Sequence, residues 1–340
     1  MTEDAFPGLA MPAEWRPQSA IWLAWPHNVE TWPENLAAAQ SEFVLLVKTI
    51  APTQQVFVLA DKERHVEAER QLGSVPGVSI VSIPTNDAWA RDYAPTFVKS
   101  PSGELVAIDW HYNAWGGKYP PFVADQLVAS RIAEFLGIDS VSTDLCFEGG
   151  AIEINDSGVL ISTTTCALNP NRNPEWTRER VEKTLRRCLG ASKFIWLAND
   201  PIEGDDTDGH IDQLARFIDD QTIVYASVED EKDPQRSGLA KNLNDLKQQL
   251  VDHRLSDYRL IPLLMPGPIE FCGRRIPASY CNFLIANELV LVPQFNQPED
   301  DLAIEVLKPL FPKRKVIGLP SLNLSVGLGS FHCLSQQQPL

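Results

Sequence analysis

The stretch AIEINDSGVLIST (residues 151–163) places one apolar run on each side of a polar turn that contains Ser-Gly. Two short apolar runs joined by such a turn are typical of a β-hairpin. The same pattern recurs at residues 96–109, 215–226 and 282–293. Successive hairpins begin about 55 to 70 residues apart, so the chain contains a long-period repeat.

Segments with apolar residues at helical spacing lie between and before the hairpins. The predicted helices cover residues 35–51, 123–137, 173–190, 237–253 and 299–311. A strand is predicted at 54–60, directly after the first of them. The segment 173–190 begins with Asn-Pro and ends at Gly, which are helix start and stop signals. Each unit therefore reads as hairpin, helix and strand, repeated about five times along the chain.

The repeated units suggest one continuous domain. No Ser/Gly-rich linker or low-complexity segment interrupts them, so we predict a single α/β domain that spans residues 1–340. Sheet units of this kind can close around an axis, as in a propeller with a helix in each blade. The loops at one end of such an axis converge, so residues far apart in the sequence would share one pocket.

The composition is that of a globular protein, with 44% hydrophobic and 22% charged residues. The net charge of −16 is opposite to that expected of a nucleic-acid-binding protein. The start of the chain lacks the features of a signal peptide, and no apolar stretch is as long as a membrane span. The six cysteines form no CxxC pair, which indicates neither a zinc site nor a disulfide framework. We expect a cytoplasmic protein with reduced thiols and no metal or cofactor.

The stretch GLGSFHC (327–333) contains a candidate nucleophile, Cys333. A thiolate is a strong nucleophile when a base is near or its pKa is lowered. The stretch from Leu322 to Leu334 reads as an ordered strand rather than a frayed terminus. Neighbours on a strand point to opposite faces, so we expect His332 to face away from the thiol and another histidine to serve it. The alternative is that Cys333 is a small buried core residue.

The stretch GDDTDGHID (204–212) offers that second histidine. His210 and Asp212 are two residues apart and would share one face of an extended segment. Such a pair can transfer protons or bind a cation. The acidic run before it, Asp205, Asp206 and Asp208, is equally explained by a solvated loop with Asx turns.

Two further stretches, NDAWARDYAP (86–95) and FEGGAIE (147–153), supply carboxylates. Asp92 is also explained by a surface ion pair with Arg91, and Glu148 by an exposed turn. Taken with Asp212, however, these carboxylates accompany a histidine and a cysteine. They would not stabilise an oxyanion, which disfavours peptide hydrolysis. They suit a planar cation such as a guanidinium, whose charge would help the thiol to ionise.

Seven motifs extend this interpretation over nearly the whole chain. They are MPAEWRPQSAIWLAWPHN (11–28), NDAWARDYAPTF (86–97), DWHYNAWGGKY (109–119), FEGG (147–150), LNPNRNP (168–174), DTDGHIDQLARF (206–217) and HCLSQQQP (332–339). In these motifs the chain resembles the agmatine deiminase and Porphyromonas-type peptidyl-arginine deiminase family of the guanidine-modifying pentein superfamily. The resemblance implies a fivefold pseudosymmetric α/β propeller built from ββαβ units.

The resemblance also implies roles for individual residues. Cys333 would be the nucleophile and His210 the general acid and base, while Asp92, Asp212 and Glu148 would bind the guanidinium. The implied reaction converts agmatine to N-carbamoylputrescine and ammonia through a covalent thiouronium intermediate, without a metal or cofactor. The family further implies a homodimer. Polyamine and putrescine biosynthesis and agmatine catabolism both remain open as pathways.

The substrate tail is expected to be an amine, because acidic and aromatic residues accompany the motifs. We place Trp89, Trp115, Asp206 and Gly329 in the substrate-binding set. Trp25 and the loop after it would form a lid, or else pack beneath a loop.

The chain departs from the family pattern at Ala151, Gln213 and Leu328, which flank the predicted catalytic residues. These differences leave peptidyl-arginine or another guanidine open as the substrate. A propeller that binds a guanidino ligand without catalysis is the non-enzymatic alternative. A thiol amidase or protease is a third possibility, which the carboxylate-rich motifs disfavour.

Overall fold

Four sheets of the protein share one plan. The computed structural model describes residues 7–198 and 201–340. In each of the four sheets two antiparallel strands form a hairpin, and the second strand pairs in parallel with a third. The strands are β4 (Thr96–Lys99), β5 (Leu105–His111) and β6 (Asp139–Cys146); β7 (Glu153–Ile154), β8 (Val159–Thr163) and β9 (Lys193–Leu197); β10 (Ala215–Asp219), β11 (Thr222–Ser227) and β12 (Arg259–Leu264); and β15 (Leu284–Ile285), β16 (Leu289–Gln294) and β17 (Lys315–Pro320). The four predicted hairpins are confirmed.

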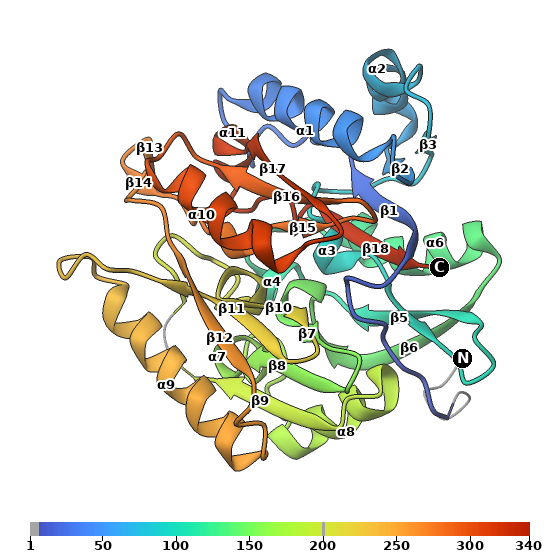
Figure 1. Cartoon of the computed structure of the whole chain (residues 1–340). Coiled ribbons are helices and arrows are strands. Elements are labelled where there is room, and N and C mark those ends of the chain that lie inside the picture. The colour runs from blue at the N-terminus through green and yellow to red at the C-terminus, as the bar shows by residue number, and fades with distance from the viewer. Residues whose placement is uncertain (1–6, 199–200) are drawn as a thin grey trace.

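A fifth sheet joins the two ends of the chain. Its order is β18 (Ser335–Pro339), β1 (Gln18–Ala24), β2 (Gln55–Leu59) and β3 (Val78–Val81). β1 pairs antiparallel with β18 and parallel with β2, so the two ends together supply the hairpin-like pair of this sheet. Figure 1 shows the C-terminal strand lying beside β1. The final residues are therefore held in place by a ladder of main-chain hydrogen bonds.

One principal helix connects the second and third strands of each three-stranded sheet, and α1 connects β1 to β2. The helices are α1 (Leu36–Ile50), α2 (Lys62–Leu72), α5 (Val123–Gln126), α6 (Val128–Leu136), α8 (Arg178–Leu189), α9 (Arg236–Asp252) and α10 (Glu299–Leu307). α1, α6, α8 and α9 lie at the periphery of the molecule in Figure 1. Short elements complete the fold: α3 (Ala90–Tyr93), α4 (Ala114–Gly117), α7 (Thr164–Ala167), α11 (Leu322–Ser325), β13 (Glu270–Phe271) and β14 (Arg274–Arg275). Among the described residues no helix combines the length and apolar character needed to cross a bilayer.

Two of the predicted helices differ from the structure, one by an internal division and one at its start. The segment 123–137 is divided into α5 and α6 at Leu127. The segment 173–190 becomes helical only at Arg178, where the side chain of Thr177 accepts a hydrogen bond from the backbone of Arg180. Asn173 does not cap this helix, because its side chain bonds the backbone of Cys146 instead.

The predicted strand at 322–334 is wrong. The chain there forms α11 and a series of turns, and the last strand begins only at Ser335. Leu328 adopts a left-handed conformation with φ 74°, which cannot continue an extended strand. Cys333 thus lies in a turn that leads into β18.

A short helical turn precedes the first strand of each repeat. α3 leads into β4, and turns at Gly149–Ala151, Ile211–Gln213 and Tyr280–Asn282 lead into β7, β10 and β15. The turn that ends at Leu334 occupies the same place before β18. The five turns carry most of the polar residues singled out in the sequence.

Two helix-terminal glycines allow a matched test of the fold. Gly190 and Gly137 end α8 and α6 in left-handed conformations, with φ 71° and 64°. A Cβ at Gly190 would lie 2.7 Å from the carbonyl oxygen of Leu9, whereas one at Gly137 would meet nothing within 4 Å. We predict that Gly137→Ala lowers the free energy of unfolding by about 1–2 kcal/mol. Gly190→Ala should cost roughly 1–3 kcal/mol more, because the N-terminal segment must move. Urea unfolding measures both, and equal losses would contradict the prediction.

Candidate active site

The thiol of Cys333 lies at the point where these turns meet. Its side chain is 6% exposed. Its sulfur lies 3.1 Å from Nδ2 of Asn282 and 3.5 Å from Oδ2 of Asp212. Oδ1 of Asn282 accepts the backbone N–H groups of His332 and Cys333, so this amide fixes the turn that holds the thiol. Asn282 was not identified from the sequence as a site residue.

The electrostatic environment keeps this thiol protonated at neutral pH. Burial, and then the negative charges of Asp212 and Asp92, raise the pKa of Cys333 well above its ordinary value. The same charges would attract a cation. A bound guanidinium would compensate them and thereby favour the thiolate.

Asp92 is held from two sides. Its Oδ2 accepts a hydrogen bond of 2.9 Å from Nε1 of Trp115, and its Oδ1 accepts one of 2.9 Å from the backbone of Gly150. Burial, assisted by the charges of Asp212 and Glu148, raises the pKa of Asp92 to about 6. A Cβ at Gly150 would lie 2.8 Å from Oδ1 of Asp92, so only glycine allows this close approach.

His210 lies between two carboxylates. Its Nδ1 is 3.6 Å from Oδ1 of Asp92, and its Nε2 is 3.5 Å from Oε2 of Glu148. The ring is 1% exposed, and within the described parts of the chain neither nitrogen has a partner at normal hydrogen-bond geometry. Burial lowers the pKa of His210, but Asp92, Cys166 and Glu148 raise it well above the ordinary value. The imidazolium form is therefore favoured, which suits a proton donor.

The structure contradicts the extended conformation expected for His210 and Asp212. Asp212 lies in a helical turn, and His210 immediately precedes it. The two side chains nevertheless reach the same site, because Asp212 approaches Cys333 while His210 approaches Asp92 and Glu148. His332 contacts Asp212 and Glu14 rather than the thiol.

Arg172 is a component of the site that sequence reasoning missed. Its Nε lies 2.8 Å and 3.0 Å from the two carboxylate oxygens of Glu148, and both side chains are fully buried. Burial raises the pKa of Glu148, but the Arg172 charge and His210 lower it to about 2. Glu148 is therefore a buried, paired carboxylate, and the predicted exposed turn is not observed. The motif LNPNRNP contained Arg172, but nothing in its spacing indicated the partner.

A third group beside Glu148 is Cys166. Its sulfur lies 3.5 Å from Oε2 of Glu148. Glu148, Cys166 and His210 place their ligand atoms within 4.8 Å of one another, as metal ligands do. Because Arg172 already engages both carboxylate oxygens of Glu148, a divalent cation would have to compete with it.

Comparison with known proteins identifies the family. Residues 10–339 match the model of the Porphyromonas-type peptidyl-arginine deiminases. The chain is 34% identical to a putative agmatine deiminase of Vibrio parahaemolyticus, with 99% of each chain covered. The chain belongs to the Porphyromonas-type peptidyl-arginine deiminase family. The resemblance inferred from the motifs is thereby confirmed.

Solved structures agree with this family assignment. Substrate-bound agmatine deiminase of C. jejuni is 31% identical, with a TM-score of 0.90 over 97% of this chain and 96% of that one. An amidinotransferase of Microseira wollei, 14% identical with a TM-score of 0.53, covers 96% of each chain and shares the fold alone. The mixed α/β fold therefore has its neighbours in the pentein superfamily.

Aromatic residues pack on one side of the thiol. Trp89 packs so closely on Gly329 that a Cβ there would lie 2.4 Å from the indole ring and 3.0 Å from Cβ of Cys333. Trp32 packs on Trp89, with ring centroids 5.4 Å apart. Trp25 is not part of a lid, because it is fully buried and packs edge-on against Phe43.

The three aspartates of the predicted acidic run lie in different environments. Asp208 pairs with Arg172 and Lys118, so it is not available to a ligand amine. Asp205 is half-buried and accepts hydrogen bonds from Thr207 and the backbone of Gly209. The carboxylate of Asp206, bonded by the hydroxyl of Tyr119, is partly exposed.

The three residues that depart from the family pattern differ in how they relate to the thiol. The side chain of Gln213 comes within 3.9 Å of the sulfur of Cys333. Leu328 holds the left-handed turn before the nucleophile. Ala151 is fully buried next to Gly150. Of the three residues, Gln213 is therefore the one whose side chain is shown to approach the thiol.

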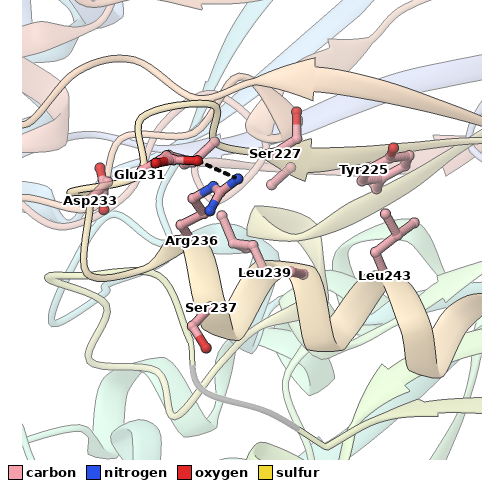
Figure 2. Close-up of a pocket in the computed structure, with 11 residues that line it drawn as sticks. Tyr225, Ser227, Glu231, Asp233, Arg236, Ser237, Leu239 and Leu243 are labelled. Atoms are coloured by element: carbon pink, nitrogen blue, oxygen red, sulfur yellow. Dashed lines mark ion pairs between the residues drawn. The ribbon is translucent and has the colours of Figure 1, made fainter.

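A separate hollow of about 480 Å³ lies between β11 and the start of α9 (Figure 2). Tyr225, Leu239 and Leu243 contribute to its lining, and Arg236 pairs with Glu231 at its rim. None of the residues predicted to carry the chemistry lines it.

Thiol reactivity tests the electrostatics of the site. Because Asp212 raises the pKa of Cys333, Asp212→Asn should accelerate alkylation of Cys333 by iodoacetamide at pH 8 by about threefold to tenfold. Mass spectrometry of the two cysteine peptides measures the rate, with the exposed Cys272 as an internal reference. A Cys333 rate that stays equal or falls relative to Cys272 would contradict the assignment.

Proposed function

We propose that this protein hydrolyses the guanidinium group of agmatine to N-carbamoylputrescine and ammonia. The observation that carries the proposal is the buried thiol of Cys333 beside Asp212, with His210 between Asp92 and Glu148. That arrangement supplies a nucleophile, a proton donor and acceptors for a planar cation. The substrate-bound agmatine deiminase that shares 31% identity with the chain supports the same substrate.

In the proposed first step, Asp92 and Asp212 accept hydrogen bonds from the guanidinium nitrogens. The substrate's charge lowers the pKa of Cys333, whose proton passes to solvent, and the resulting thiolate attacks the central carbon. His210 protonates the departing nitrogen, the carbon–nitrogen bond breaks, and ammonia leaves. A positively charged thiouronium remains bound to the sulfur.

In the second step, His210 takes a proton from water, whose oxygen attacks the same carbon. The carbon–sulfur bond breaks, and the sulfur leaves as the Cys333 thiolate, which is reprotonated. The neutral ureido product is released together with one proton. Glu148, held by Arg172, keeps the imidazole oriented throughout.

We also propose that the five sheets are the blades of a fivefold propeller within one catalytic domain over residues 1–340. The shared strand plan supports this arrangement, as does the position of each helical turn before the first strand of its sheet. A cytoplasmic homodimer that acts in polyamine and putrescine synthesis is the corresponding proposal for assembly, location and pathway. The resemblance to the family supports it.

The tail of the substrate is proposed to be an amine. Two cations beside the site, Lys118 and Arg172, both pair with Asp208 and so are not free to bind the carboxylate of arginine. Asp206 and the indoles of Trp89 and Trp115 would receive the amine end, and Gly329 allows Trp89 to pack closely beside the thiol.

Peptidyl-arginine is the second candidate substrate, because the matching family model carries that description. The burial of Cys333 and the tight packing of Trp89 favour a small free molecule over a segment of polypeptide. A guanidino-binding protein without catalysis is less well supported, since the thiol and His210 are both in place.

Ammonia release tests the reaction and the substrate together. Purified protein should release ammonia from agmatine, and much less from arginine or an arginine-containing peptide. Cys333→Ser should lower kcat by about 10³-fold or more, because a hydroxyl is a far weaker nucleophile. The matched control Cys272→Ser, at an exposed position, should retain full activity. Preferential turnover of the peptide would move the assignment to the second candidate.

The pH profile tests the role of Asp92. Its pKa of about 6 means that the carboxylate becomes protonated as the pH falls below 6 and can no longer bind the cation. We predict that kcat/KM for agmatine falls about tenfold per pH unit below this value, since kcat/KM reports the free enzyme. A flat profile between pH 7 and 5 would rule Asp92 out as the guanidinium ligand.

A further inference from the structure

A histidine outside the proposed reaction lies directly behind Asp212. Nδ1 of His332 is 2.8 Å from Oδ2 of Asp212, and its Nε2 is 3.0 Å from Oε2 of Glu14. All three side chains are at least nine-tenths buried. The imidazole therefore bridges two carboxylates, one of which borders the thiol.

Glu14 is anchored independently of the active site. Its carboxylate pairs with Arg216, and its Oε1 accepts a hydrogen bond of 2.9 Å from the backbone of Ile285. Arg216 is itself fixed by Glu153, at 2.8 Å, and by the carbonyl oxygens of Cys281 and Phe283. Glu14 thus gives His332 a rigid support that comes from the first segment of the chain.

The two contacts determine which protons the imidazole carries. Burial raises the pKa of Glu14, but Arg216 and His332 lower it far below its usual range. Burial likewise raises the pKa of Asp212, while the hydrogen bond and charge of His332 bring it below the ordinary value. Two ionised carboxylates can only accept hydrogen bonds, so His332 must donate from both ring nitrogens.

We infer that His332 is a positioning residue for the deimination reaction, and that Glu14 holds it in place. Its Nδ1–H fixes Oδ2 of Asp212 and keeps that carboxylate ionised beside the buried thiol. Oδ1 of Asp212, which has no hydrogen-bond partner in the described part of the protein, is then left to accept from the guanidinium. This inference rests on the proposed function.

The charged surroundings of Asp212 show why such a support is needed. Cys333 and His332 both contact its Oδ2, at 3.5 Å and 2.8 Å, while the charges of Asp92, Arg91, His210 and Arg216 also act on this carboxylate. Among the nitrogen-containing side chains around this carboxylate, the His332 imidazole is the one with a hydrogen bond to it in the described part of the chain. Without it, Asp212 would more readily take up a proton and lose its attraction for a cation.

Two substitutions of His332 by amides distinguish the hydrogen bonds that its two ring nitrogens make. The amide nitrogen of Asn corresponds to Nδ1 of histidine, and the longer Gln carries its amide near the position of Nε2. His332→Asn therefore keeps a donor for Asp212 and loses the bond to Glu14, while His332→Gln does the reverse. We expect His332→Gln to lower kcat/KM for agmatine by about 10- to 100-fold, mainly through KM, and His332→Asn to lose less than about tenfold.

The pH profile distinguishes positioning from general structural damage. In His332→Gln the acid limb of kcat/KM should become steeper than the limb that Asp92 sets in the wild type, because the pKa of Asp212 rises and a second carboxylate is then protonated in the acid range. In His332→Asn it should stay near that of the wild type. The inference would be overturned if both variants lost kcat/KM equally, kept the pH profile of the wild type and had matched thermal stability. Wild-type kcat/KM in His332→Gln would do the same.

A measurement that does not depend on activity tests the bridge itself. Protein labelled with ring-¹⁵N histidine should show two slowly exchanging ring N–H protons at neutral pH that disappear in His332→Gln. A single such proton would overturn the bridge. If the wild type releases no ammonia from agmatine, the proposed function fails, and the NMR result still decides whether the bridge exists.

Discussion

The pairing of buried charges is the constraint on which the site depends. Removing an ion from water costs several kcal/mol unless partners compensate it. Glu148 is compensated by Arg172, Asp212 by His332, and Glu14 by Arg216. Each of these pairs joins residues that are distant in the sequence or belong to different repeats. The sheets must therefore be correctly placed before any of these carboxylates can be buried.

The topology of the chain serves this requirement. Each repeat begins with a short helical turn, and these turns carry Asp92, Gly150, Asp212, Asn282 and Cys333. A sheet then anchors each turn from behind. The last sheet needs both ends of the chain, because β18 pairs with β1. Cys333, the proposed nucleophile, is consequently fixed near the C-terminus, where a chain would otherwise be expected to fray.

The site combines a protonated thiol with an excess of negative charge. This combination is unsuited to attack on a neutral amide, since the charges oppose formation of a thiolate. In the proposed reaction it becomes reactive when a cation enters and offsets Asp92 and Asp212. The substrate would then contribute to activating its own nucleophile, which would give selectivity for guanidinium groups over amides. Arg172 and His332 maintain the negative charge in the absence of substrate.

The sequence by itself determined the repeat, the four internal hairpins and the family. Hairpin turns and helical spacing are local signals, and the motifs around Cys333, His210 and Asp92 are contiguous stretches. Local sequence signals gave wrong predictions where the tertiary structure determined the local conformation. Asn173 bonds the backbone of Cys146 and so does not start a helix, and the left-handed Leu328 ends the predicted final strand.

Only the tertiary structure decided how the charges are paired. Arg172 and Glu14 lie in recognisable motifs, yet their partners Glu148 and His332 are 24 and 318 residues away. Spacing along the chain carries no information about such pairs, because the partners meet only when the chain folds. The same packing gives the two aspartates of the acidic run different environments. Asp206 is partly exposed, whereas the charge of Asp208 is neutralised by Arg172 and Lys118. The sequence named the candidate reacting groups, and the packing of the chain set their charge.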